Sequence, residues 1–232
     1  MAAVGKAHNV WALIVACGKS EQISPEVDTA FLQMGDQPVL AHSLVAFEQC
    51  SEIDGILVVA PKDRLDSVVG MARMYGTPKL KKIVGGSLQK TVSIKAGLAA
   101  LDEIDPSMVV IHESSQPCVT AHIISETIKA ARRYGVAVAA QKEDVPVVTV
   151  PKGLTADKLI DAGTAWTLAM PVAAKTEPLR KALGLDKSKT KVDDTNFSGR
   201  LFKGVHVVPL DRPNLRIRSL ADIQVVSTAM RT

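Results

Sequence analysis

A continuous apolar run near the start of the chain constrains the fold more than any other feature. Residues 10–16 are all apolar, and the run ends just before Gly18. A strand with one face in water alternates apolar and polar residues, whereas a strand covered by helices on both faces is apolar throughout. The run therefore predicts a central strand of a parallel sheet.

The segments that follow alternate between short apolar runs and longer amphipathic stretches. Parallel strands need crossover helices, whereas antiparallel hairpins need only tight turns, so this alternation favours a parallel sheet. The order predicts an α/β fold with a doubly wound, mostly parallel, Rossmann-like sheet. We expect strands over residues 55–61, 81–84, 107–112 and 136–140, and helices over residues 38–49, 64–75, 91–101 and 123–134.

The regular alternation ends at about residue 141. Residues 145–153 hold two β-rich pieces interrupted by proline and glycine, and proline is tolerated mainly on edge strands. We expect residues 141–167 to form an inserted arm that protrudes or meets the edge of another subunit. Residues 1–232 then form a single domain with a dimerisation arm. The remaining predicted elements are helices over 177–183 and 220–230 and strands over 205–209 and 215–217.

Composition narrows the classes of ligand. The 28 basic and 24 acidic residues give a formal net charge of +4, whereas a nucleic-acid-binding protein concentrates basic residues on one face. Cys17, Cys50 and Cys118 lack CxxC spacing, so neither a disulfide framework nor a zinc site is indicated. No apolar run reaches the ~18 residues that span a bilayer. We expect a cytoplasmic protein with no nucleic-acid or membrane partner.

The loop after the first strand has the general form of a phosphate-binding loop. In such loops the backbone N–H groups of a glycine-containing turn point at an anion. Residues 16–22 hold one glycine where a dinucleotide fingerprint needs three, and they lack the GKS/T end of a P-loop. A dinucleotide-dependent oxidoreductase is therefore disfavoured.

Six motifs occur in the order found in one family of nucleotidyltransferases. Residues 16–44 contain the start of an A-A-G-x-G-x-R-M loop and the end of its G-x-P-V/L-L-x-H-S/T extension. The chain resembles the 2-C-methyl-D-erythritol 4-phosphate cytidylyltransferases from Val10 to its C-terminus. The other motifs are G-G-x-x-R-x-x-S-V at 86–94, V-H-D-A-A-R-P at 110–117, L-W-x-x-x-T-P at 166–171, T-D-D-A at 192–195 and N-I-K-V at 214–217.

This resemblance implies a nucleotide-diphospho-sugar transferase fold and the transfer of CMP from CTP to a sugar or polyol phosphate. In the family the acceptor is 2-C-methyl-D-erythritol 4-phosphate, an isoprenoid precursor. The resemblance also implies a homodimer formed through the arm, a Mg²⁺ ion held by Glu113, and catalytic cations at Lys19 and Arg216. The implied nucleotide-binding residues are Ala16, Cys17, Gly18, Ser20, Gly86, Ser87 and Ser93, and the implied acceptor-binding residues are Val145, Ala162 and Met170.

Several positions depart from the family pattern in charge. Gln22 and Thr29 stand where the loop has an arginine and a lysine, and Gln116 replaces the arginine that follows the metal-binding acid. Transfer of a phosphoryl-type group depends on positioning and on neutralising phosphate charge. These changes, together with Ala162 in place of an arginine, favour a second hypothesis. It is a catalytically inactive paralogue that binds a ligand or a partner protein.

Overall fold

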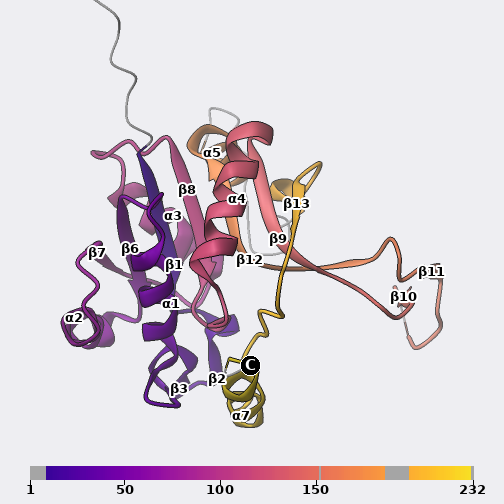
Figure 1. The fold of residues 1–232 in the computed structure, drawn as a ribbon, viewed down its shortest axis with the longest axis horizontal. Helices are drawn as coiled ribbons and strands as arrows, with labels where there is room; N and C mark the ends of the chain where they lie inside the picture. Colours follow the sequence, from indigo (N-terminus) through magenta and orange to yellow (C-terminus); the bar gives the residue numbers. More distant parts are fainter. Residues whose placement is uncertain (1–8, 152, 186–198, 231–232) are drawn as a thin grey trace, which may run out of the picture.

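A seven-stranded sheet runs through the centre of the molecule (Figure 1). The computed structural model describes residues 9–151, 153–185 and 199–230, so the motif at 192–195 lies outside the described residues. In spatial order the strands are β13 (His206–Pro209), β9 (Val136–Lys142), β12 (Trp166–Lys175), β8 (Met108–Glu113), β1 (Val10–Val15), β6 (Gly55–Ala60) and β7 (Leu80–Gly85).

The sheet is mostly parallel, as the alternating pattern predicts. β1 lies between β6 and β8 and is parallel to both, and β7 and β13 are parallel to their neighbours. β12 is the exception, because it runs antiparallel to both β8 and β9. The helices are α1 (Val39–Gln49), α2 (Leu65–Met74), α3 (Lys90–Ala100), α4 (Ala121–Tyr134), α5 (Thr176–Ala182) and α7 (Leu220–Ala229).

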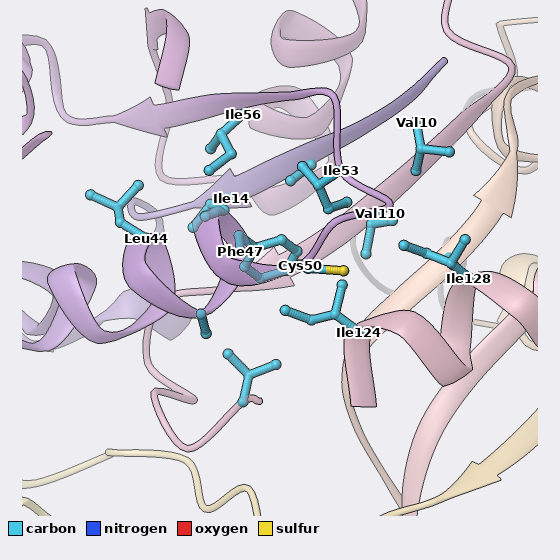
Figure 2. Close-up of a cluster of buried hydrophobic side chains, with 14 of the residues drawn as sticks. Val10, Ile14, Leu44, Phe47, Cys50, Ile53, Ile56, Val110, Ile124 and Ile128 are labelled. Carbon is cyan, nitrogen blue, oxygen red and sulfur yellow. The ribbon is translucent and has the colours of Figure 1, made fainter. Parts of the chain in front are cut away.

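Alternate residues of β1 supply the two halves of the core. Ile14 faces α1 and α4, where it packs in one apolar cluster with Phe47 and Ile124 (Figure 2). Leu13 faces the other side and packs with Ile94 of α3. Both faces of the strand are therefore covered, which explains why the run is apolar at every position. Phe47 is fully buried, and truncating such a side chain to alanine costs about 3 to 5 kcal/mol.

The inserted arm is present as an extension of two sheet strands. β9 and β12 continue past the body of the molecule, and the arm ends in a hairpin of β10 (Val147–Thr149) and β11 (Lys158–Ile160) (Figure 1). Only one strand of the hairpin, β10, lies within the two extended pieces predicted at residues 145–153, and its antiparallel partner β11 lies outside them. The expected turn at 166–171 is instead the irregular first half of β12, where the pairing with β9 shifts between Leu168 and Val172.

The C-terminal segment corrects one prediction. The strand expected over residues 215–217 is absent, because this segment crosses the carboxyl ends of the sheet strands instead of joining an edge. Its backbone is held by a hydrogen bond from Ile217 N to Ser115 O at 2.8 Å. A capping box at Ser219 then starts α7, and the segment before it lies over the end of β8.

Short elements connect β1 to α1. They are the 3₁₀ turns η1 (Lys19–Glu21) and η2 (Thr29–Phe31) and the two-stranded pairs β2 (Gln22–Ser24) with β3 (Val27–Asp28) and β4 (Gln33–Met34) with β5 (Gln37–Pro38). A third 3₁₀ turn, η3 (Lys62–Arg64), leads into α2. In the described part of the chain, no helix combines the length and the apolar character needed to cross a membrane.

Candidate active site

The loop after β1 and Glu113, the last residue of β8, lie at the same edge of the sheet. β1 and β8 are parallel neighbours in register, with Val15 opposite Glu113. The backbone continues this pairing beyond the strands, since Ser114 N donates to Val15 O at 3.0 Å. Parallel strands that end together bring the residues after them together, and ligands of open α/β sheets bind at this edge.

The glycine loop is attached to the loop that precedes α3. Gly18 adopts φ 107°, a conformation that glycine reaches without strain, and Lys19 N donates to Leu88 O at 3.1 Å. Gly86 is needed for a different reason. A Cβ at Gly86 would stand 2.1 Å from Cys17 Sγ, so the two loops approach too closely for a side chain there.

A cleft of about 400 Å³ lies between these two loops. Of the predicted nucleotide-binding residues, four line this cleft: Cys17, Gly18, Gly86 and Ser87. The other three do not line it. Ala16 is buried, Ser20 is exposed, and the buried Ser93 uses its hydroxyl to hold the loop, accepting from Ser87 N at 2.9 Å. Lys19, a predicted catalytic cation, is exposed and is also absent from the lining.

Two positions where the family has cations serve the structure of the loop itself. Gln22 Nε2 donates to Asp28 Oδ1 at 2.9 Å. Thr29 is fully buried, and its hydroxyl has no hydrogen-bond partner among the described residues. The cleft is lined by the carboxylates of Glu26, Asp28 and Asp63 and by the cations of Lys62 and Arg64. Its charges are therefore mixed.

A smaller pocket of about 140 Å³ contains the predicted metal-binding acid. Glu113 is fully buried, Lys90 Nζ lies 2.7 Å from its Oε1, and the Arg216 guanidinium contacts its Oε2. Burial opposes the charge of Glu113, but the nearby Lys90 and Arg216 prevail and hold the pKa of its carboxyl below the usual value. Glu113 is thus ionised and forms ion pairs with both Lys90 and Arg216.

The same pocket includes Met170, a predicted acceptor-binding residue, and Gln116. Gln116 Oε1 accepts a hydrogen bond from Met170 N at 2.7 Å, and Asn214 Nδ2 donates to Met170 O at 2.8 Å. Gln116 therefore fixes the irregular part of β12. The remaining predicted acceptor residues, Val145 and Ala162, belong to the arm and line neither pocket.

Glu21 is a site residue that the sequence analysis missed. Its side chain is fully buried and accepts hydrogen bonds from the hydroxyls of Ser114 at 2.8 Å and Ser115 at 2.7 Å, and from Ser115 N at 2.8 Å. Arg216 Nη1 lies 3.3 Å from Glu21 Oε1. Burial, reinforced by the charge of Glu113, raises the pKa of Glu21 to about 7. An acidic residue is unexpected inside a loop that binds phosphate, and this feature of the sequence could have drawn attention to Glu21.

His112 precedes the acidic residue but faces the core. It is fully buried, Nε2 lies 3.0 Å from Ser43 Oγ, and its ring is tilted against Phe47 at 5.2 Å. Burial lowers the pKa of His112 to about 3, so the imidazole is neutral at ordinary pH. Its contacts are those of a structural residue.

The described residues hold no cluster of three or more His, Cys, Asp or Glu side chains able to bind a metal. Glu113 offers a single carboxylate, and each of its oxygens faces a cation. A Mg²⁺ ion would have to share the Glu113 carboxylate with Lys90 or Arg216, and most of its ligands would have to come from water and phosphate.

The mostly parallel sheet, with its cleft at the carboxyl end of the central strand, has the nucleotide-diphospho-sugar transferase fold. A family model described as 2-C-methyl-D-erythritol 4-phosphate cytidylyltransferase (IspD) matches residues 10–232. The chain belongs to this family.

Individual relatives agree with this membership. The 2-C-methyl-D-erythritol 4-phosphate cytidylyltransferase of Caldanaerobacter subterraneus is 30% identical over 96% of this chain and 99% of its own length. A ribitol-5-phosphate cytidylyltransferase of Lacticaseibacillus paracasei is 27% identical over 75% of each chain. Among solved structures, the 4-diphosphocytidyl-2C-methyl-D-erythritol synthase of Anaerococcus prevotii superposes with a TM-score of 0.80 at 22% identity, covering 97% of each chain.

Proposed function

We propose that the protein is a cytidylyltransferase that binds CTP in the 400 Å³ cleft and transfers CMP to a sugar or polyol phosphate. The observation that carries this proposal is the contact of Lys90 and Arg216 with Glu113, in the small pocket at the same edge of the sheet as the cleft. In the reaction, an acceptor phosphate oxygen attacks the α-phosphorus of CTP and pyrophosphate leaves. Two relatives named for different polyol phosphates support this acceptor class.

Each side chain has a distinct part in this proposal. Gly18 and Gly86 let the two loops that border the cleft approach each other closely. Lys90 and Arg216 supply positive charge where charge develops on the transferred group. Glu113 would hold a Mg²⁺ ion, which when bound would neutralise phosphate charge. Glu113 also orients both cations while no nucleotide is bound.

We expect slow turnover compared with relatives that keep the loop cations. Gln22 is paired with Asp28 and Thr29 is buried, so neither position offers a positive charge to phosphate. Loss of one charged contact to a transition state costs about 3 to 4 kcal/mol, which is a factor of several hundred in rate.

A second candidate function is an inactive paralogue that binds a ligand or a partner protein. The observation that favours it is the buried ion pair of Arg216 with Glu21. This carboxylate competes with phosphate for the guanidinium. In this case the cleft would bind a nucleotide without turnover.

We also propose a homodimer in the cytoplasm, formed through the arm. The β10–β11 hairpin exposes Val147, Val148 and Leu159, and a two-stranded hairpin has little stability by itself. A second copy that covers these side chains would also bring Val145 and Ala162 toward a neighbouring site. Light scattering tests this: Val148→Asp should halve the mass, whereas Met74→Asp, on an exposed position of α2, should leave it unchanged.

Calorimetry and pyrophosphate release test the main proposal. CTP with Mg²⁺ should bind more tightly than ATP, GTP or NAD. Pyrophosphate should then appear with 2-C-methyl-D-erythritol 4-phosphate or ribitol 5-phosphate and disappear in Lys90→Met. Binding of CTP without release of pyrophosphate from any polyol phosphate would favour the inactive paralogue. Failure to bind any nucleotide would reject the cytidylyltransferase.

A further inference from the structure

Four donors converge on the Glu21 carboxylate. Ser114 Oγ and Ser115 N both lie 2.8 Å from Oε2, while Ser115 Oγ lies 2.7 Å and Arg216 Nη1 3.3 Å from Oε1. The Arg216 guanidinium also contacts one of the other donors, since its Nη1 donates to Ser115 Oγ at 3.0 Å. Two hydroxyls, one backbone N–H and a guanidinium are the groups that proteins use to bind a carboxylate or phosphate.

These donors come from parts of the chain that are distant in sequence. Ser114 and Ser115 follow β8, Arg216 belongs to the C-terminal segment, and Glu21 reaches them from the loop after β1, 195 positions before Arg216. The donor set is also fixed without Glu21. Ser114 N pairs with Val15 O, and Ser115 O pairs with Ile217 N. The fold thus holds the anion-binding groups in place from both sides.

We propose that Ser114, Ser115 and Arg216 form a buried site for a single negative charge, and that Glu21 fills this site as an internal substitute for a ligand carboxylate. Glu21 then determines specificity, because an anionic ligand group can reach these donors only by displacing it.

The neighbouring charges limit the ligand class to small monoanions. Glu113 contacts the other guanidinium nitrogen, so a second negative charge already lies across Arg216 from this site. Burial and the charge of Glu113 raise the pKa of Glu21, so even one negative charge at this site is opposed, and a second would be opposed more strongly. Formate or acetate matches the site better than pyrophosphate does.

Removing the internal carboxylate should open the site to an external one. In Glu21→Ala, formate at about ten times its dissociation constant should raise the Tm by roughly 3 to 5 °C at constant ionic strength. The wild-type Tm should rise by less than about 1 °C, because Glu21 already occupies the donors. Pyrophosphate should stabilise the variant less than formate does. Glu21→Ser leaves similar space and serves for the same measurement where Glu21→Ala folds poorly.

A matched double variant identifies the donors. Glu21→Ala with Ser115→Ala should lose most of the formate effect, whereas Glu21→Ala with Ser24→Ala should keep it, since Ser24 bonds to Glu26 instead. The proposal is wrong if formate raises the Tm of the single Glu21 variants no more than that of the wild type. A larger effect of pyrophosphate than of formate would overturn the single-charge limit. None of these measurements depends on turnover.

Discussion

Gln22 donates a hydrogen bond from Nε2 to Asp28 Oδ1 at 2.9 Å, so a carboxylate faces the position where relatives carry an arginine. Asp28 would neutralise an arginine introduced at this position. We therefore expect Gln22→Arg alone to strengthen CTP binding only slightly. Gln22→Arg combined with Asp28→Asn should strengthen it about tenfold, as one charge-assisted hydrogen bond to phosphate would.

Calorimetry at low salt measures this difference, and Gln33→Arg, which adds the same charge on exposed β4, is the control. Equal gains from the single and double variants would show that Asp28 does not oppose phosphate.

Thr29 buries a hydroxyl that has no partner among the described residues. Thr29→Val should raise the free energy of unfolding by about 1 kcal/mol, because the cost of burying an unpaired polar group is removed. Thr29→Lys should lower it by about 2 kcal/mol or more, since Thr29 is fully buried and lysine is both larger and charged. Restoring the family lysine alone therefore harms the fold.

Urea unfolding measures both effects. Thr127→Val is the matched control, because the buried Thr127 hydroxyl donates to Ile123 O at 2.7 Å and its loss should destabilise. A destabilising Thr29→Val would mean that its hydroxyl has a partner in solution.

Glu21 and His112 give stability opposite dependences on pH. The pKa of Glu21 rises on folding from 4.5 to about 7, so its contribution is full below pH 4.5 and is lost as pH rises through 7. The pKa of His112 falls from 6.5 to about 3, so its contribution is full above pH 6.5 and is lost as pH falls toward 3. Between pH 4.5 and 6.5 the two contributions oppose each other.

Glu21→Gln removes one of these two opposing contributions. The free energy of unfolding of this variant should increase more steeply with pH between 4.5 and 6.5 than that of the wild type. Urea titrations across this window measure the slopes, with Glu26→Gln on the exposed part of the loop as the control. Identical slopes for Glu21→Gln and wild type would contradict the raised pKa of Glu21.

The approach of Cys17 to Gly86 gives a prediction about packing. Gly86→Ala should destabilise by about 1 to 3 kcal/mol, since its Cβ would overlap Cys17 Sγ. Cys17→Ala in the same chain should recover part of this loss. Recovery stays incomplete because Val59 Cγ1 would still lie 2.8 Å from the new methyl group.

A double-mutant cycle in urea isolates the coupling between the two positions. Gly70→Ala in α2 is the control, because a Cβ there meets nothing within 4 Å and alanine favours a helix by about 0.5 to 1 kcal/mol. Strict additivity of Cys17→Ala and Gly86→Ala would show that the two loops separate in solution.

The strands and helices that were predicted correctly are those whose pattern of apolar residues lies within the element itself. β1, β6 and β8 are apolar at nearly every position because helices cover both faces, and this burial is visible in the residues themselves. β12 was not predicted, since its first half combines exposed residues with Pro171 and pairs irregularly. Residues 215–217 have the sequence pattern of a strand, but they pair with no strand in the described part of the chain.

The candidate site was only partly predictable for a similar reason. Glu113 and Gly18 follow apolar strands, so their place at the edge of the sheet could be inferred from the pattern. The role of Glu21 depends on Arg216, which is 195 positions away, and no periodicity connects the two. The family motifs predicted cations at the loop but gave no role to the Glu21 carboxylate.

The long separation between Glu21 and Arg216 also bears on the order in which the site forms during synthesis. A nascent chain that has reached the end of β8 contains Glu21 and Glu113 but not yet the guanidinium that both carboxylates contact. Of the two cations that contact Glu113, only Lys90 has been synthesised at that stage. The final form of this edge of the sheet must therefore wait until the ribosome has added Arg216.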